Sequence, residues 1–312
     1  MNILIADKFP NLYIEQMKDL GHNVTFKPEL GENDIPSNIE TIDILVVRST
    51  KVNAEAIEKG KQLKVIIRAG AGVNTIDLAK ATEKGVAVTN CPGKNSIAVA
   101  ELAMGLILSL DRRIPDNVAD FHAGKWNKNE YSKAEGLFGK KLFLIGVGNI
   151  GKEVAKRAVA FGMKVYGYHI VELNNEFITQ VKDIKETIPQ VDIISIHLPQ
   201  TPQTKGMFNK EMFDLMKPGT IFINTSRPGI VDEQALIEAV KTKNLKVGLD
   251  VFNDEPEGKD GEIKSPLQGI KNVYVTHHIG ASTEQAQLAV AEETVRIIKT
   301  FAESGEVLNK VN

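Results

Sequence analysis

The chain has 312 residues, of which 42% are hydrophobic and 25% charged, and its formal net charge is -2. These values are typical of a globular protein of about two domains, and they exclude a strong electrostatic attraction to nucleic acid or anionic lipid. The apolar run at the N-terminus is too short for a signal peptide, and no apolar stretch approaches the ~20 residues of a membrane span. A single cysteine, Cys91, excludes an intrachain disulfide, which fits a reducing compartment. From these observations together we expect a cytoplasmic protein with no membrane and no nucleic-acid partner.

Short β-branched runs alternate with helical patterns in the first 95 residues. This alternation predicts α/β layers around a parallel sheet. The predicted strands are residues 3–6, 24–27, 44–47, 65–67 and 86–89. The predicted helices between them are residues 12–20, 54–59 and 76–84. We therefore expect a small doubly wound domain at the start of the chain.

A long apolar helix is predicted at residues 96–110, where it would link this unit to a second one. The second unit has predicted helices at residues 152–161, 210–215 and 233–242, between predicted strands at residues 141–145, 164–168, 193–197, 220–224, 246–249 and 273–276. A last helix at residues 283–302 follows these strands, and we expect it to return to the first unit. The predicted domains are thus a discontinuous domain, residues 1–95 plus 283–312, and an inserted domain, residues 96–282.

The inserted domain opens with an apolar run and a G-x-G-x-x-G fingerprint. A strand, a tight glycine turn and a helix N-terminus in this order form an anion site, because backbone N–H groups point outwards there. We assign Gly146 to the tight turn, Gly148 to the close approach of a pyrophosphate, and Gly151 to the packing of helix on strand. Asn149 and Ile150 complete the predicted cofactor-binding turn. Six predicted parallel strands then make this a Rossmann-type dinucleotide-binding domain.

Three segments of the inserted domain each end a predicted strand and carry a chemically active side chain. These side chains are Arg227, Glu255 and His278. The carboxyl ends of parallel strands meet at one edge of a sheet, and that edge faces the cofactor in dinucleotide-binding folds. We therefore expect a guanidinium, a carboxylate and an imidazole at neighbouring strand ends. The adjacent His277 is interpreted as structural.

This arrangement resembles the D-isomer-specific 2-hydroxyacid dehydrogenase family. The resemblance extends over nearly the whole chain and includes residues 47–50 (VRST), 68–74 (RAGAGVN) and 90–96 (NCPGKNS). It implies two doubly wound parallel-sheet domains, in which a Rossmann cofactor domain is inserted into a flavodoxin-like substrate domain. It also implies a homodimer, for which the very apolar helix at residues 96–110 is a candidate contact. It implies no metal.

The resemblance also implies a role for each of these side chains. Arg227 is expected to hold the carboxylate and carbonyl of the substrate, His278 to act as general acid/base, and Glu255 to orient His278 and favour its protonated form. These roles agree with elementary chemistry, because reduction of a keto acid needs a proton donor that titrates near neutral pH. Thr225 and Asp250 are expected to contact the cofactor, Asp250 near its nicotinamide carboxamide.

The resemblance places substrate binding in the first domain. The backbone N–H groups of Ala71, Gly72 and Val73 would bind a carboxylate in a glycine-rich turn. Arg48 is a candidate for a substrate phosphate, and a solvated surface arginine is the equal alternative. The favoured reaction converts a small 2-hydroxy acid, 3-phosphoglycerate, to the 2-keto acid 3-phosphohydroxypyruvate in serine biosynthesis. The alternatives are a glyoxylate or hydroxypyruvate reductase, another D-2-hydroxyacid dehydrogenase, or a non-enzymatic corepressor that senses the dinucleotide.

Two positions depart from the family pattern. His169 stands where a dinucleotide fingerprint expects an acidic residue for the ribose hydroxyls, and no arginine follows it. NAD is therefore the expected cofactor with NADP left open, and His169 is expected to line the ribose site. Pro228 follows Arg227 where relatives usually carry glycine. Proline favours extended backbone angles at the residue before it, which would either tighten or distort the position of Arg227.

Overall fold

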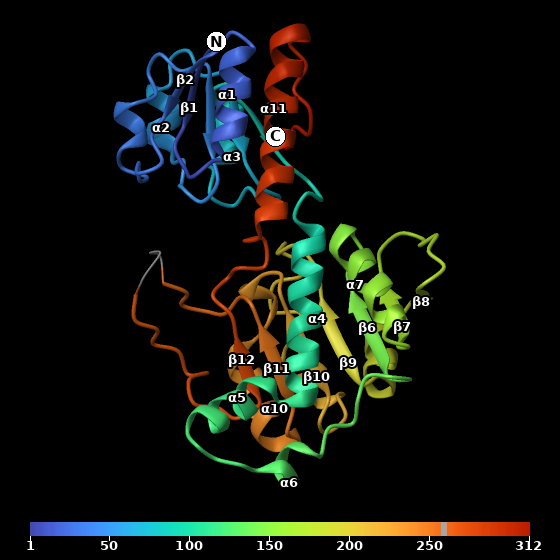
Figure 1. Cartoon of the computed structure of the whole chain (residues 1–312). Coiled ribbons are helices and arrows are strands. Elements are labelled where there is room, and N and C mark those ends of the chain that lie inside the picture. The colour runs from blue at the N-terminus through green and yellow to red at the C-terminus, as the bar shows by residue number, and fades with distance from the viewer. Residues whose placement is uncertain (257–260) are drawn as a thin grey trace. The chain divides into compact units, whose positions relative to one another are not determined.

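The computed structural model describes residues 1–256 and 261–312, and it divides into two compact units (Figure 1). The first unit comprises Met1–Asn95 and Ala281–Asn312, and the second comprises Ser96–Gly280. Each unit is built on one sheet whose paired strands all run parallel. The predicted fold class, α/β with two doubly wound parallel sheets, is confirmed.

Five strands form the sheet of the first unit, in the order β2-β1-β3-β4-β5. They are β1 (Asn2–Ile5), β2 (Asn23–Phe26), β3 (Ile44–Val47), β4 (Val65–Arg68) and β5 (Ala87–Asn90). The register pairs Ile3 of β1 with Val24 of β2 and with Ile44 of β3. This strand order is the flavodoxin-like variant of the doubly wound fold, in which ligands bind outside the carboxyl ends of the strands.

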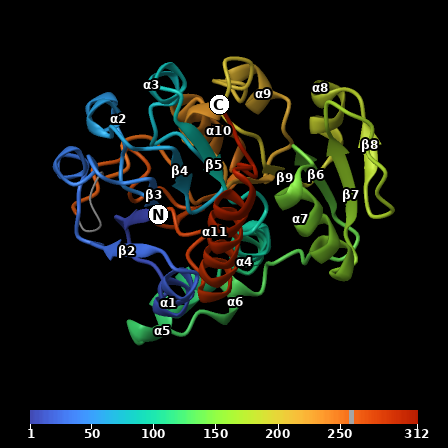
Figure 2. The same cartoon turned by 90° about the horizontal axis from the view of Figure 1, so that it is seen from above.

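Helices cover both faces of this sheet, because its strands direct apolar side chains to each face in turn. The helices are α1 (Asn11–Asp19), α2 (Ala54–Lys59), α3 (Leu78–Glu83) and α11 (Glu284–Ser304), with a 3-10 turn η1 (Ile35–Ser37). Ile3 and Ile5 pack with α1 and α11, whereas Leu4 packs with α2 and α3. Figure 2 shows α1 beside α11, and α2 and α3 on the other side of the strands.

Seven strands form the sheet of the second unit, in the order β12-β11-β10-β9-β6-β7-β8. They are β6 (Lys141–Ile145), β7 (Lys164–Tyr168), β8 (Thr179–Val181), β9 (Ile193–Ile196), β10 (Ile221–Asn224), β11 (Lys246–Leu249) and β12 (Val273–Val275). The winding reverses between β6 and β9, as in dinucleotide-binding folds. The prediction of six strands was wrong by one. The missed edge strand, β8, has three residues, and no apolar β-branched run marks it in the sequence.

The helices of the second unit also lie on both faces of its sheet. They are α4 (Ser96–Arg112), α5 (Ile114–His122), α6 (Lys128–Tyr131), α7 (Asn149–Ala160), α8 (Ile184–Thr187), α9 (Lys210–Asp214) and α10 (Glu233–Lys243), with 3-10 turns η2 (Ile188–Gln190) and η3 (Pro228–Ile230). In Figure 1, α4 and α7 lie along one face, and α9 and α10 contribute to the core of the other. The helices α5 and α6 bury no residue, and neither was predicted, although Ile114, Val118 and Phe121 of α5 have helical i, i+4, i+7 spacing.

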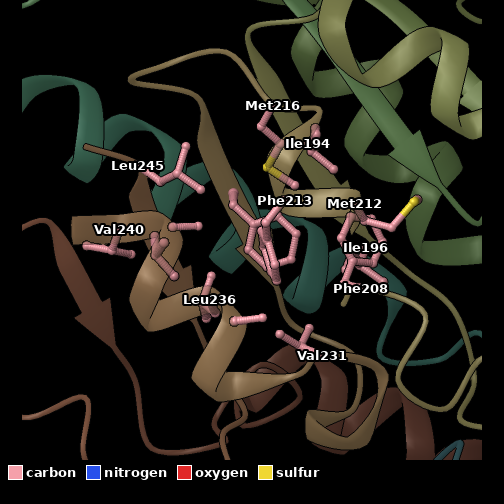
Figure 3. Packing of buried hydrophobic residues seen from close by; sticks show 14 of the residues in the cluster. Ile194, Ile196, Phe208, Met212, Phe213, Met216, Val231, Leu236, Val240 and Leu245 are labelled. Carbon is pink, nitrogen blue, oxygen red and sulfur yellow. The ribbon is translucent and has the colours of Figure 1, made fainter. Parts of the chain in front are cut away.

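The core beneath α9 and α10 is centred on aromatic rings. Phe208, Phe213 and Phe222 are buried, and their ring centroids lie 5.2 to 6.0 Å apart in tilted or edge-on contacts. Figure 3 shows Phe208 and Phe213 with Ile194 and Ile196 of β9. Burial of each such side chain stabilises the fold by roughly 1.5–3 kcal/mol. This packing supports β9 and β10, and the segments that carry His197 and Arg227 follow these strands.

Helix α4 buries its apolar side chains within the second unit. The side chains of Ala103, Ile107 and Leu110 pack in the core that α4 shares with α7 and the sheet. The apolar composition of this helix is therefore explained by the core of its own unit and needs no second subunit. Several large apolar side chains are exposed instead on α5 and in the segment that follows it: Val118, Phe121, Trp126 and Phe138. Within the described residues, no helix has both the length and the apolar character that crossing a membrane requires.

Candidate active site

The glycine turn joins β6 to α7. Gly146 has a φ of +95°, and a Cβ on it would clash with the carbonyl oxygen of His197. A Cβ on Gly151 would clash with the carbonyl oxygen of Gly146, so the helix packs directly on the turn. A Cβ on Gly148 would meet no atom within 4 Å, and no side chain caps the helix that starts at Asn149. The first N–H groups of α7 are therefore available to a ligand.

Ile150, the remaining residue of the turn, is half-buried and packs against the core shared by α4 and α7. Two polar atoms at the same edge of the sheet, Oγ1 of Thr225 and Nδ1 of His197, are buried without a hydrogen-bond partner in the described part of the chain. A buried polar atom without a partner costs about 1–3 kcal/mol, so a ligand that satisfies such atoms gains affinity. The glycine turn, the uncapped helix and these atoms fit a phosphate-bearing dinucleotide. Among the described residues, no group of three or more His, Cys, Asp or Glu could hold a metal ion.

His278 and Glu255 form a hydrogen-bonded pair at this edge. Nδ1 of His278 lies 2.7 Å from Oε2 of Glu255, and Oε1 of the same carboxylate accepts from the N–H of Phe252 at 3.1 Å. The carboxylate therefore has one fixed orientation. Its hydrogen bond and its charge raise the pKa of His278 above the ordinary value, although burial acts in the opposite direction. Because Nδ1 is engaged by Glu255, Nε2 is the ring nitrogen left for a substrate.

Asp250 braces the backbone that carries His278. Asp250 is 2% exposed. Its carboxylate accepts hydrogen bonds from the hydroxyl of Thr276 at 2.6 Å and from the N–H groups of Ile279 and Gly280 at 2.9 and 2.8 Å. The carbonyl oxygen of Asp250 accepts from the N–H of His278 at 2.9 Å. His278 has a φ of +52°, an uncommon backbone conformation for a residue with a side chain, and these bonds hold it there. The contact of Asp250 with a nicotinamide carboxamide stays a prediction.

Arg227 follows β10 with an extended backbone, φ -144° and ψ 139°, as expected for a residue before proline. The amide of Asn224 donates to the carbonyl oxygen of Arg227 at 3.0 Å, and its Oδ1 accepts from the N–H and hydroxyl of Ser226 at 3.0 and 2.7 Å. Pro228 is the first residue of the turn η3, a position that proline suits because of its fixed φ. Nη1 of Arg227 donates to the carbonyl oxygen of Ser226 at 2.6 Å. Within the described residues, the guanidinium makes no other hydrogen bond.

The three predicted catalytic side chains influence one another electrostatically. Burial lowers the pKa of Arg227, and the charge of Glu255 opposes this effect. The charge of Arg227 in turn opposes the rise in the pKa of His278. The loops that carry these side chains follow β10, β11 and β12, which are adjacent in the sheet. The second unit alone therefore brings a guanidinium, a carboxylate and an imidazole together.

His197 also lies at this edge, and the sequence reasoning did not single it out. It directly follows β9, its Nε2 lies 2.9 Å from Oγ of Ser195, and burial lowers the pKa of His197 to about 4. The imidazole is therefore neutral near pH 7 and is not a proton donor in this range. Its place after a strand, like that of Arg227, is the sequence signal that could have identified it.

The loop after β7 carries His169. The side-chain amide of Gln180 donates to the carbonyl oxygens of His169 and Val171 at 3.4 and 2.9 Å, and its Oε1 accepts from the N–H of Leu173 at 2.8 Å. The side chains of Ile170 and Val171 are exposed. The start of this loop thus offers an imidazole and two apolar side chains to a ribose, and neither a carboxylate nor a guanidinium.

The predicted substrate residues follow two neighbouring strands of the first unit. Arg48 follows β3, whereas Ala71, Gly72 and Val73 follow β4 within a turn that Asn90 fixes by donating to the carbonyl oxygen of Ala71 at 2.6 Å. All four residues are half-buried. In the part of the chain that the structure describes, the Arg48 side chain has no hydrogen bond or ion pair, and the N–H groups of the other three have no acceptor. A free guanidinium and free N–H groups can bind an anion.

Known proteins resemble this chain in sequence over most of its length. A hydroxypyruvate reductase of Thermotoga maritima is 45% identical over 278 residues, which are 88% of this chain and 89% of that protein. A D-3-phosphoglycerate dehydrogenase of Methanocaldococcus jannaschii is 41% identical over 311 residues, which are 96% of this chain and 58% of that protein. The chain spans 53% to 59% of the length of the curated phosphoglycerate dehydrogenases that it matches.

Solved structures also resemble this chain over its whole length. The TT0316 protein from Thermus thermophilus matches with a TM-score of 0.89 and 31% sequence identity, over 100% of both chains. The family model of the D-isomer specific 2-hydroxyacid dehydrogenase, NAD binding domain, matches residues 104–280, which carry the glycine turn and all three predicted catalytic side chains. The chain therefore belongs to the D-isomer-specific 2-hydroxyacid dehydrogenases, a family of nicotinamide-dependent oxidoreductases.

Proposed function

We propose that this protein transfers a hydride between a nicotinamide dinucleotide and a small D-2-hydroxy acid or the matching 2-keto acid. The observation that carries the proposal is the 2.7 Å hydrogen bond between His278 and Glu255, at the edge that also carries Arg227. A proton donor with a raised pKa and an arginine are the two groups that the protein must supply. The dinucleotide supplies or accepts the hydride when it is bound at the glycine turn.

His278 holds the proton that the reaction moves. In the reducing direction Nε2 donates to the carbonyl oxygen of the keto acid, and in the oxidising direction it accepts the proton of the hydroxyl group. Glu255 stabilises the imidazolium and so raises the pKa of His278, which keeps the donor charged to higher pH. Reduction should therefore slow as the pH rises past this pKa, whereas oxidation should accelerate over the same range.

Arg227 binds the substrate and stabilises charge on it. Its planar fork fits a carboxylate in a bidentate manner, and its charge favours the negative charge that develops on the reacting oxygen. Loss of one such donor typically costs about 2.7–4 kcal/mol of transition-state stabilisation. Asn224 and Pro228 contribute by fixing the backbone on which this guanidinium is carried.

We assign dinucleotide binding to residues 96–282 and substrate binding to residues 1–95 plus 283–312. The 3-phosphoglycerate and 3-phosphohydroxypyruvate pair is the leading substrate pair, with a role in serine biosynthesis. It is supported by Arg48, whose guanidinium has no partner among the described residues and would bind the phosphate. The N–H groups of Ala71, Gly72 and Val73 would bind the carboxylate. The second candidate is reduction of hydroxypyruvate or glyoxylate, which the 45% identity to a hydroxypyruvate reductase favours.

NAD is the proposed cofactor. The loop that starts at His169 has no arginine or lysine through residue 181, so it offers no cation to the 2′-phosphate of NADP. The same loop start has no carboxylate at His169 for the ribose hydroxyls. Discrimination between the two cofactors should therefore be modest.

A steady-state screen of 2-keto acids against NADH and NADPH tests these proposals together. If Arg48 binds a phosphate, 3-phosphohydroxypyruvate should exceed hydroxypyruvate in kcat/KM by about tenfold or more, because one charged contact contributes about 1.5–3 kcal/mol. A preference for hydroxypyruvate would instead select the second candidate. Absence of turnover with every 2-keto acid, by enzyme that still binds the dinucleotide, would refute the proposed activity.

The same protein is proposed to act as a homodimer in the cytoplasm. The exposed apolar side chains of Val118, Phe121, Trp126 and Phe138 support a second subunit at α5 and the segment after it. The one cysteine, Cys91, is buried and unpaired, which is consistent with a reducing compartment. Light scattering should give twice the chain mass, and Phe121→Glu with Trp126→Glu should give the mass of one chain. A wild-type mass of one chain would contradict the dimer.

A further inference from the structure

Asp7 lies at the carboxyl end of β1 and binds the loop that follows the neighbouring strand β3. Its Oδ2 accepts hydrogen bonds from three successive backbone N–H groups, those of Arg48 at 2.7 Å, Ser49 at 3.1 Å and Thr50 at 3.0 Å. Its Oδ1 accepts from the hydroxyl of Ser49 at 3.1 Å. The residue is 7% exposed. One buried carboxylate therefore satisfies four donors of a single loop.

Successive N–H groups that converge on one point form an anion-binding concavity. In this loop the anion is a side chain of the protein itself, so a substrate phosphate or carboxylate cannot use these N–H groups. The side chain of Arg48, on the same loop, makes no hydrogen bond or ion pair within the described residues. The backbone of Arg48 is thus fixed, whereas its guanidinium is available.

We propose that Asp7 is the positioning residue for recognition of the substrate's charged end through Arg48. The proposal rests on the proposed role of Arg48 in substrate binding. By holding the N–H of Arg48 and of the next two residues, Asp7 sets the direction in which the guanidinium leaves the sheet. An ordered loop also reduces the conformational entropy that substrate binding would otherwise cost.

The site favours a carboxylate, because three N–H groups converge on one oxygen and bind a charged acceptor more strongly than a neutral one. An asparagine in place of Asp7 would keep one acceptor oxygen, and its NH2 group could donate to the hydroxyl oxygen of Ser49, but the charge would be lost. An alanine would leave these three N–H groups without the carboxylate that now accepts from them, so an anion from solution would find an open site there. The proposal therefore predicts that a small carboxylate from solution can replace the missing side chain.

The test compares Asp7→Ala, Asp7→Asn and Arg48→Ala with the wild-type enzyme, using 3-phosphohydroxypyruvate and hydroxypyruvate with NADH. Asp7→Ala should raise the KM for the better substrate by about tenfold and Asp7→Asn by less, with kcat and the KM for NADH changed by less than about twofold in both. Sodium formate should lower the KM of Asp7→Ala towards the wild-type value. It should leave the KM of the wild-type enzyme and of Arg48→Ala unchanged.

A matched control separates positioning from loss of stability. Asp43 accepts from the N–H of Asn2 at 2.8 Å and from Lys64, and it braces the same pair of strands at the opposite, amino edge. Asp43→Ala should lower the Tm without a change in KM and without a response to formate. Asp7→Ala should lower the Tm as well, and only this variant should change the KM.

The double variant Asp7→Ala, Arg48→Ala distinguishes the two roles. If Asp7 acts through Arg48, the double variant should have the KM of Arg48→Ala alone, and formate should have no effect on it. If Arg48→Ala raises the KM whereas both Asp7 variants keep the wild-type KM, the role of Asp7 is refuted and that of Arg48 stands. If Arg48→Ala keeps every KM unchanged, the proposed role of Arg48 is refuted, and the inference about Asp7 fails with it.

Discussion

The two units use a buried carboxylate in the same way at the carboxyl edges of their sheets. Asp7 follows β1 and binds the loop after β3, whereas Asp250 follows β11 and binds the loop after β12. Each loop carries a basic side chain, Arg48 in the first unit and His278 in the second. In both cases the acceptor is 7% exposed or less, so the loop backbone is fixed where water has little access.

The units differ in what the basic side chain contacts next. His278 bonds to a second carboxylate, that of Glu255, at 2.7 Å, whereas the guanidinium of Arg48 has no partner in the described residues. A group that exchanges a proton needs a partner that sets its pKa, but a group that only binds a ligand must keep its donors free. This difference agrees with the proposed roles, in which the second unit carries the chemistry and the first unit binds the substrate.

The largest loss of activity is expected from substitution of Arg227 in the second unit. Arg227→Ala should lower kcat/KM for the keto acid by about 10²–10³-fold, because a donor to the developing oxyanion is lost. Arg227→Lys should recover little of this loss, because an ammonium group cannot reproduce the bidentate fork. Steady-state kinetics measure the loss, and the fluorescence of bound NADH checks that cofactor affinity is unchanged. Retention of more than about a tenth of the activity would remove Arg227 from the mechanism.

A smaller loss is expected when the partner of His278 loses its charge. Glu255→Gln should lower kcat for reduction by about 10–100-fold, and the limb of the pH profile that falls with rising pH should move to lower pH. The sign follows from the carboxylate, which raises the pKa of His278 in the wild-type protein. Glu262→Gln is a matched control, because this exposed side chain makes no described contact with the site. A pH profile that does not move would contradict the role of the pair.

Substitution of Arg48 in the first unit should change the KM for the substrate and leave kcat unchanged. With 3-phosphohydroxypyruvate as substrate, Arg48→Ala should raise the KM by about tenfold or more, because one charged contact is lost. The KM for hydroxypyruvate, which has no phosphate, should rise less and serves as the internal control. An equal effect on both substrates would assign Arg48 to the substrate carboxylate. A fall in kcat alone would contradict the proposal that the first unit only binds the substrate.

The smallest effect is expected at the ribose site. His169→Asp should increase the ratio of kcat/KM with NADH to kcat/KM with NADPH by about threefold to tenfold, because a carboxylate accepts from the ribose hydroxyls and repels a 2′-phosphate. The ratio is measured at saturating keto acid with both cofactors. An unchanged ratio would show that residue 169, in the loop after β7, does not discriminate between NADH and NADPH.

Local sequence patterns predicted the parts of the fold that depend on neighbouring residues. The strands β3, β6 and β11 have the predicted bounds. β3 is an uninterrupted apolar run, and β6 and β11 have no charged residue after a first lysine, as suits parallel strands that are buried on both faces. The extended backbone of Arg227 was predicted from Pro228 alone. The three-residue edge strand β8 was missed because it has no apolar run. The helix α5 was missed although Ile114, Val118 and Phe121 have helical spacing in the sequence.

The contacts that organise the site could not be predicted in this way. Asp7 and Arg48 are 41 residues apart, and Asp250 and Gly280 are 30 residues apart. Such contacts arise from strands that are adjacent in a parallel sheet, and adjacency across a crossover leaves no local signal in one sequence. The place of His197 after β9 is a local signal, but its burial and its contact with Gly146 of the glycine turn depend on distant parts of the chain.

The most direct test of the proposed chemistry is a single-turnover measurement on two adjacent histidines. Enzyme loaded with NADH is mixed with 3-phosphohydroxypyruvate or hydroxypyruvate, and the decay of nucleotide fluorescence is followed for the wild type, His278→Ala and His277→Ala. We expect His278→Ala to slow this step by about 10²–10⁴-fold and His277→Ala to leave it within about threefold, because only His278 is paired with Glu255. A rate for His278→Ala within about tenfold of the wild type, with NADH still bound, would contradict the assignment of His278 as the proton donor.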